Sequence, residues 1–218
     1  MEDAKFPLAA FDEIGYQAVF SGQKTYNGVA IISRARPEDV VKDMVGYDDH
    51  QKRVIAATVN GVRVVCAYIP NGQTVESEKY QYKLKWLTAL QTYMRDAIAA
   101  YGDVALLGDY NIAPEDRDVH DPKAWEGQVL CSVPERDAFR ALVALGLTDS
   151  FRLFEHPEKS FSWWDYRMNG FKRNLGLRID HILLTGNLAG ACTSSIIDVE
   201  PRKLDRPSDH APVIADIC

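Results

Sequence analysis

The chain has 218 residues, of which 46% are apolar and 26% charged, and its formal net charge is −6. This length and composition are those of one ordinary globular domain, spanning 1–218, with enough apolar residues to bury a core. The acidic balance excludes a chain that is basic throughout, so a nucleic-acid site would have to be a local patch.

The four cysteines are far apart in the sequence and include no Cys-x-x-Cys pair. This spacing argues against a zinc site and a disulfide framework, and it fits a reducing cytoplasm. No apolar run approaches the roughly 18 residues of a membrane span. The N-terminal MEDAKFP lacks the basic and then apolar pattern of a secretory signal. We therefore expect a soluble, cytoplasmic protein with no membrane partner.

The first half of the chain is predicted to contain three strands and a long helix. The segment 27–33 reads as a buried strand, and 53–70 holds two β-branched runs joined by Asn60-Gly61, a dipeptide suited to a hairpin turn. Over 76–100 the apolar residues recur at three- and four-residue steps. This spacing predicts an amphipathic helix that stops before Gly102.

The second half alternates strands with a loop and a shorter helix. A short buried strand is predicted over 103–109, followed by a long loop over 112–129. Ser132 and Glu135 have the spacing of a capping box, ahead of a helix that ends near Gly146. Further strands are expected over 178–186 and 211–217. This order predicts a layered α/β domain with hairpins rather than a doubly wound parallel sheet.

Polar side chains stand near the ends of four of these strands, in the segments AYIPNG, LLGDYN, LRIDHILL and PSDHAPV. Each segment alone is explained equally well as a turn, a helix cap or a solvated corner. Together they would form a site if the strand ends meet at one edge of the fold. The residues concerned are Tyr68, Asn71, Asp109, Asn111, Asp180, Asp209 and His210.

Such a set has the chemistry of metal-assisted phosphodiester hydrolysis. Carboxylate and amide oxygens without a thiolate suit a hard cation such as Mg²⁺ or Mn²⁺. An Asp beside an Asn can orient and deprotonate a water molecule, and a His paired with another Asp can hold a phosphoryl oxygen. The predicted reaction is therefore attack of water on a phosphodiester.

The segments AYIPNG, LLGDYNIAP, FSWWDYR, LRIDHILL and SDHAPV, in this order, resemble the exodeoxyribonuclease III family of abasic-site endonucleases, within the endonuclease/exonuclease/phosphatase superfamily. The resemblance implies a four-layered α/β sandwich, in which two mixed β-sheets pack face to face with helices outside. It also implies a Mg²⁺-dependent DNA repair nuclease that cuts on the 5′ side of abasic sites, with 3′-to-5′ exonuclease and 3′-phosphodiesterase activity. The implied partner is double-stranded DNA with abasic sites or blocked 3′ ends, bound by a nucleoid-associated monomer.

The same resemblance assigns roles to individual residues. Asp109 resembles the residue that activates the water, and Asn111 the one that fixes the water and the phosphate. His210 resembles the phosphate-binding histidine and Asp180 its carboxylate partner. Tyr68 and Asn71 resemble phosphate contacts. The metal ligands implied are Asp109, Asn111 and Asp209.

The segment 161–178 supports a nucleic-acid substrate independently of those acids. From Tyr166 to Arg178 it carries four cations and no acid, and two tryptophans precede it. Cations track a phosphate backbone, whereas aromatic side chains contact exposed sugars or bases, or fill the core. Core packing is the more usual role for both tryptophans. The residues predicted to bind substrate, besides Asn71, are Trp164, Arg167, Lys172, Arg173 and Arg178.

The beginning of the chain departs from the family pattern. Neither the N-x-N-G motif nor the Q-E-T motif, whose glutamate is a principal metal ligand of the family, is present. We therefore expect the first two strands of the family fold to be absent, which would expose unpaired strand edges and apolar faces. Two alternatives stay open: a catalytically impaired, DNA-binding remnant of the family, and an unrelated domain whose strand-end acids are turns.

Overall fold

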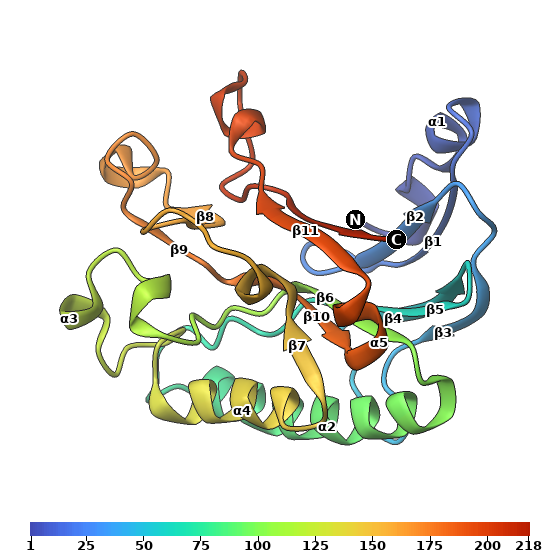
Figure 1. Cartoon of the computed structure of the whole chain (residues 1–218), viewed down its shortest axis with the longest axis horizontal. Helices are drawn as coiled ribbons and strands as arrows, with labels where there is room; N and C mark the ends of the chain where they lie inside the picture. Colours follow the sequence, from blue (N-terminus) through green and yellow to red (C-terminus); the bar gives the residue numbers. More distant parts are fainter.

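The computed structural model describes residues 1–218, and a six-stranded sheet forms its centre (Figure 1). The strand order is β3-β4-β5-β6-β10-β7, and every neighbouring pair is antiparallel except the parallel pair β5 and β6. The bounds are β3 Glu38–Lys42, β4 Val54–Val59, β5 Val62–Ala67, β6 Val104–Asp109, β10 Asp180–Thr185 and β7 Leu147–Asp149. The sheet is therefore mixed, as expected.

Two helices, whose N-terminal ends lie side by side, cover one face of this sheet (Figure 1). Helix α2 (Glu78–Tyr101) crosses from β5 to β6, and α4 (Val133–Val143) packs beside it. Their apolar faces and the sheet enclose the main core, in which Trp86, Leu90 and Leu106 are fully buried. The capping box of Ser132 and Glu135 is present, so both predicted helices are confirmed, although α4 ends three residues before Gly146.

The opposite face of the sheet carries two separate two-stranded sheets. One pairs β1 (Gln17–Ser21) with β2 (Val29–Ser33), and the other pairs β11 (Cys192–Ile197) with β12 (Val213–Ile217). The first lies over β4 and β5, and the second lies beside β10. Two layers of sheet therefore pack together as predicted, but the upper layer is divided into two hairpins.

Short elements complete the chain. They are the helices α1 (Leu8–Glu13), α3 (Pro122–Trp125) and α5 (Gly186–Gly190), the paired strands β8 (Trp163–Trp164) and β9 (Gly176–Leu177), and five 3-10 turns. The turns span Asp3–Lys5, Asp116–Asp118, Ser150–Leu153, Arg167–Asn169 and Glu200–Lys203. No helix has the length and apolar character needed to span a membrane.

The backbone conformations that the sequence signals required are present. Asn60 and Gly61 join β4 to β5 with φ angles of 49° and 83°, as the predicted hairpin turn needs. Gly108 stands just before Asp109 at φ 139°, and a β-carbon there would lie 2.0 Å from the carbonyl oxygen of Ala67. Only glycine allows β6 to approach the end of β5 so closely. The position of Asp109 at the end of β6 therefore depends on Gly108.

Candidate active site

Three of the predicted residues meet at one end of the central sheet, where strand β6 ends and strand β10 begins. Strands β6 and β10 pair with Asp109 directly opposite Asp180. His210 reaches the same end because its backbone bridges to that of Trp163. One potential ligand atom from each of Asp109, Asp180 and His210 lies within 4.8 Å of the others. Residues 30 to 101 positions apart in the sequence therefore form one cluster.

The carboxylate of Asp109 is held by Asn111, two residues further along the chain. The backbone N–H of Asn111 donates to Oδ1 of Asp109 at 2.8 Å, and its side-chain Nδ2 donates to Oδ2 at 3.0 Å. Asn111 adopts a left-handed φ of 49° to make this turn. Asn71 extends the array, since its Nδ2 donates to Oδ1 of Asn111 at 2.9 Å. Both carboxylate oxygens of Asp109 are thus oriented by hydrogen bonds before any ligand binds.

The electrostatics of Asp109 favour a base rather than a permanently charged group. Burial and then the nearby carboxylate of Asp180 raise the pKa of Asp109 to about 7, against the opposing effect of His210. A carboxylate whose pKa lies near the working pH can accept a proton and release it again. This is the property required of a group that activates water.

His210 has the opposite character. Its Nδ1 lies 2.8 Å from Oδ2 of Asp180, and the side chain is 30% exposed. Burial opposes protonation, but the hydrogen bond and charge of Asp180 outweigh it and raise the pKa of His210 to about 9. Ser162 fixes the acid, because its hydroxyl donates to Oδ2 of Asp180 at 2.7 Å. His210 is therefore a cation that can donate a hydrogen bond from Nε2.

Tyr68 and Asp209 lie at the border of this cluster. Burial and then the charge of Asp109 raise the pKa of Tyr68, and Asp209 contributes in the same direction. The phenol stays protonated and can donate a hydrogen bond. Asp209 accepts a hydrogen bond from Nε1 of Trp163 at 3.0 Å, which leaves its other oxygen free. All seven predicted residues near strand ends thus belong to one neighbourhood.

The donors of this neighbourhood fit a hard divalent cation. The three side chains that the structure brings together offer carboxylate oxygens and an imidazole, and no thiolate lies among them. The charge of His210 makes it a poor metal ligand, because a protonated imidazole has no free lone pair. The carboxylates of Asp109 and Asp180 are therefore the groups of this cluster that would hold the cation. The roles of Asp209 and of the amide oxygen of Asn111 as metal ligands stay predictions.

Three of the cations predicted to bind substrate are exposed on the loop between β8 and β9. Arg167 is 88% exposed and lies 3.6 Å from its neighbour Asp165. Lys172 and Arg173 are exposed as well, and the guanidinium of Arg173 donates a long hydrogen bond to the backbone oxygen of Met168, at 3.4 Å. These three side chains are free to meet a phosphate backbone.

Two predicted substrate contacts are wrong. Trp164 is 2% exposed and packs with Phe161 and Ala211 in a small core cluster. Arg178 is 1% exposed, and its guanidinium binds Asp118 at 2.7 Å and Asp149 at 2.8 Å. Neither side chain can reach a ligand at the surface. Core packing, the alternative considered for the tryptophans, applies to Trp164.

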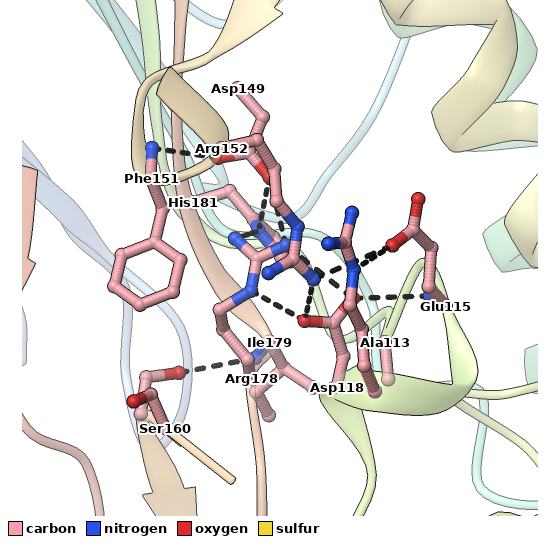
Figure 2. A network of polar contacts seen from close by, with 12 residues as sticks. Ala113, Glu115, Asp118, Asp149, Phe151, Arg152, Ser160, Arg178, Ile179 and His181 are labelled. Carbon is pink, nitrogen blue, oxygen red and sulfur yellow. Dashed lines mark hydrogen bonds and ion pairs between the residues drawn. The ribbon is translucent and has the colours of Figure 1, made fainter. Parts of the chain in front are cut away.

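The buried Arg178 instead ties loops to the strand that carries Asp180 (Figure 2). Nη1 of Arg178 is an obligate donor and lies 2.9 Å from Nδ1 of His181, so Nδ1 must accept. The proton of this imidazole is therefore on Nε2, which donates to the carbonyl of Ile112 at 2.9 Å. Burial, and then the charge of Arg178, lower the pKa of His181 to about 4, so it stays neutral. The network joins the residues flanking Asp180 to the loop that follows Asn111.

A groove beside Tyr68 and Asn71 was not predicted. It has a volume of about 700 Å³ and is lined by cations but by no acid. Tyr26, which is 77% exposed, also lines it. Arg53 on its wall stacks on the ring of Tyr68, with its guanidinium carbon 4.8 Å from the ring centroid. The cations are Lys24, Arg53 and Lys79. They come from separate segments of the chain, so no local charge run signalled them.

Comparison with known proteins agrees with this geometry. The model of the endonuclease/exonuclease/phosphatase family matches residues 2–210. The chain is 35% identical to exodeoxyribonuclease III of Haemophilus influenzae, over 98% of this chain and 85% of that protein. The chain therefore belongs to the endonuclease/exonuclease/phosphatase family, among its exodeoxyribonuclease III-like nucleases.

Two solved structures are similar over the whole chain. The 3′ phosphatase NExo from Neisseria, bound to a product DNA hairpin, has a TM-score of 0.98 and 48% identity. An AP endonuclease from Archaeoglobus fulgidus has a TM-score of 0.95 and 39% identity. In both comparisons the match covers 100% of this chain and 85% of the other. The predicted family and the α/β fold are thus confirmed.

Proposed function

We propose that the chain is a DNA repair phosphoesterase that uses Mg²⁺ or Mn²⁺ to hydrolyse the phosphodiester on the 5′ side of an abasic site, together with 3′-to-5′ exonuclease and 3′-phosphodiesterase activity. The observation that carries this proposal is the meeting of Asp109, Asp180 and His210 within 4.8 Å. This meeting places Asp109, a base whose pKa is about 7, beside His210, a cationic hydrogen-bond donor.

The residues divide the work of hydrolysis between them. Asp109 accepts the proton of the attacking water, while Asn111 holds Asp109 in place. His210, kept charged by Asp180, donates to a phosphoryl oxygen as negative charge builds up on it. Tyr68 donates a second hydrogen bond to the same group. When bound, a divalent cation neutralises phosphate charge and favours the ionised form of Asp109.

Positively charged surfaces on two sides of this cluster support a DNA duplex as the substrate. The groove beside Tyr68 lies on one side, and the loop with Arg167, Lys172 and Arg173 follows β8 on the other. In an acidic chain, cations gathered at two places next to the cluster provide the local patch that phosphate binding needs. One chain holds all of these residues, so a monomer suffices.

A second candidate is an enzyme restricted to 3′ ends. The identity to the 3′ phosphatase NExo is 48%, against 39% to the archaeal AP endonuclease. The same residues would then hydrolyse a terminal 3′-phosphate, because water attack and oxyanion stabilisation are common to both reactions. What differs is whether the surface around the site accepts an uninterrupted strand.

A panel of end-labelled duplexes tests the two candidates. One carries a synthetic abasic site, one a 3′-phosphate at a nick, and one is undamaged, each with Mg²⁺, Mn²⁺ or EDTA. Incision beside the abasic site supports the first candidate, and phosphate release without incision supports the second. DNA that is bound but unchanged with either metal would contradict both and favour the catalytically impaired remnant.

A further inference from the structure

Lys83 lies inside the molecule, directly behind the candidate active site. It is on α2, and its side chain has no exposed area. Its Nζ donates to the backbone carbonyl of Asn111 at 2.6 Å and to that of Asn71 at 3.1 Å. The third partner is a carboxylate oxygen of Glu135 on α4. All three protons of the ammonium group are therefore used.

Glu135 is itself fixed, so it anchors the lysine. Its carboxylate accepts hydrogen bonds from the backbone N–H groups of Leu130 at 3.0 Å and Ser132 at 3.1 Å, and from the Ser132 hydroxyl at 2.5 Å. It has no exposed area either. A carboxylate held by four donors cannot follow a moving partner. Lys83 is thus attached to the frame of α4 rather than to a mobile side chain.

A buried ion pair of this kind is a poor way to stabilise a core, because removing two charges from water costs more than apolar side chains of the same size would. Satisfying such a pair fully makes it rigid and specific in direction. The direction here is toward two carbonyl groups, and both belong to proposed active-site residues. The ion pair of Lys83 and Glu135 is therefore better explained as a support of the active site than as a source of core stability.

The two asparagines need such a fixed point. Asn71 follows the end of β5 and Asn111 follows the end of β6, where the pairing of these strands has ceased. Asn111 adopts a left-handed φ of 49°, which turns its carbonyl toward the helix. Its side chain then accepts from Asn71 and donates to Asp109. Any shift of either backbone would pass to Asp109 through these bonds.

We propose that Lys83 is a positioning residue of the active site: its ammonium group, anchored on Glu135, clamps the Asn71 and Asn111 carbonyls and so fixes the orientation of Asp109. Only the predicted effect of Lys83 on turnover rests on the proposed function. Lys83 contacts no substrate. It acts through the asparagines, and the clamp exists whichever phosphoester is hydrolysed.

Turnover tests the kinetic consequence. Lys83→Met keeps most of the length of the side chain but removes the ammonium group and its three donors. It should lower kcat about 10- to 100-fold and leave KM nearly unchanged, because an error of about an ångström in the reacting geometry costs up to about a hundredfold in rate. Lys85→Met, an exposed lysine on the same helix, should change neither constant.

A second control separates positioning from loss of stability. Met94 is fully buried further along α2, away from the asparagines. Met94→Ala should lower the urea midpoint of unfolding while kcat per folded molecule stays that of the wild type. If Lys83→Met proves too unstable to study, Glu135→Gln removes the charged anchor, and it should show the same fall in kcat. A wild-type kcat in the folded Lys83→Met or Glu135→Gln protein would overturn the proposal, as would an equal fall in kcat for Met94→Ala.

Nuclear magnetic resonance gives a readout that needs no activity. In the wild type the side-chain NH₂ groups of Asn71 and Asn111 are hydrogen bonded, so their signals should be shifted and slow to exchange with water. Lys83→Met should move both signals and speed their exchange, whereas Lys85→Met should not. Unmoved signals would refute the clamp. If the wild type hydrolyses no DNA, the proposed function fails, but this comparison still decides the role of Lys83.

Discussion

His210 is held by a hydrogen bond whose strength depends on its charge. Its pKa is about 9 in the folded chain, against 6.5 for an ordinary histidine. A histidine whose pKa is raised by folding contributes stability that is complete below the unfolded value of about 6.5, and that is lost as the pH rises through about 9. On this sign, the pair with Asp180 stabilises the fold at neutral pH and ceases to do so in mild alkali.

Urea unfolding in EDTA at pH 6.5 and pH 9.5 measures this contribution. The wild type should lose on the order of 2 kcal/mol more than His210→Asn over that interval, after allowance for solvent screening of a partly exposed side chain. All other titrating groups should lower the free energy of unfolding equally in the two proteins. An identical loss in the two proteins would mean that His210 is not paired as described.

Asp109 follows the opposite rule. Its folded pKa of about 7 lies above the ordinary value of 3.8, so its ionisation costs stability as the pH rises between these two values. A site that raises the pKa of its own base sacrifices stability for reactivity. Asp109→Ala should therefore be at least as stable as the wild type at pH 7.5, as judged by its urea midpoint, and a clear decrease in that midpoint would contradict the assignment.

At the scale of elements, the network around Arg178 connects the loop over 112–121 to the start of β10 (Figure 2). Arg178→Met would leave the carboxylates of Asp118 and Asp149 buried without their principal partner. Removing one member of a buried pair costs about 3–5 kcal/mol, so we expect a loss of that size in urea unfolding. Arg167→Met, at an exposed arginine, should cost less than about 0.5 kcal/mol. A loss for Arg178→Met as small as that of Arg167→Met would show that the network is not a structural support.

The loop between β8 and β9 is expected to bind phosphate rather than to take part in catalysis. Replacing Arg167, Lys172 and Arg173 together by alanine should flatten the plot of log Kd against log salt by about 2 to 3 units of slope, because each phosphate contact contributes about 0.9. The kcat should change little. The exposed Lys85 and Arg95 on α2 provide a matched control, whose replacement should leave the slope unaltered. An unchanged slope in the triple variant would contradict a role of this loop in DNA binding.

The elements also show which kinds of secondary structure can be predicted from the sequence. The hairpin at Asn60-Gly61 and the helix over 76–100 were predicted because turn chemistry and periodicity are local signals. Strand β3 reads Glu-Asp-Val-Val-Lys and β7 has three residues, so neither has an apolar pattern, and pairing with the sheet creates them. Strands β1 and β11 were missed as well, since β1 has a polar residue at each end of a brief apolar run and β11 begins with small polar residues.

The site was predictable to the extent that it uses motifs. Asp109, Asp180 and His210 meet as expected, because strand ends gather at one edge of a sheet. Arg178 was misplaced because its partners, Asp118 and Asp149, lie 60 and 29 positions away, and a cation in a basic run is usually a surface residue. Lys83 carried a signal that was overlooked, since it follows Tyr80 by three residues on the buried stripe of α2.

At the scale of the whole molecule, stability should be uneven. The hairpins β1-β2 and β11-β12 are isolated two-stranded sheets, and Ile32, Ile196 and Ile214 on them are 41%, 48% and 38% exposed. A two-stranded sheet is marginally stable without further partners. The six-stranded sheet has the helices on one face and buried side chains along its central strands. The two hairpins should therefore open more easily than the central sheet.

Hydrogen exchange followed by mass spectrometry tests this division. Amides of the two hairpins should exchange well before those of β4, β5, β6 and β10, because local opening needs less free energy where few apolar contacts hold a segment. The strands that carry the active site should belong to the slow group. Equal protection in all strands would show that the upper layer is as stable as the sheet beneath it.

The central claim is that Asp109 performs the chemistry of a site assembled at the sheet edge. The most direct measurement compares Asp109→Ala with the wild type on the duplex that the wild type cleaves best, with Mg²⁺, alongside the affinity of each protein for the same DNA in EDTA. We predict a fall in turnover of about two to four orders of magnitude, as loss of a general base produces, with little change in affinity. Turnover at the wild-type rate in Asp109→Ala would contradict the account.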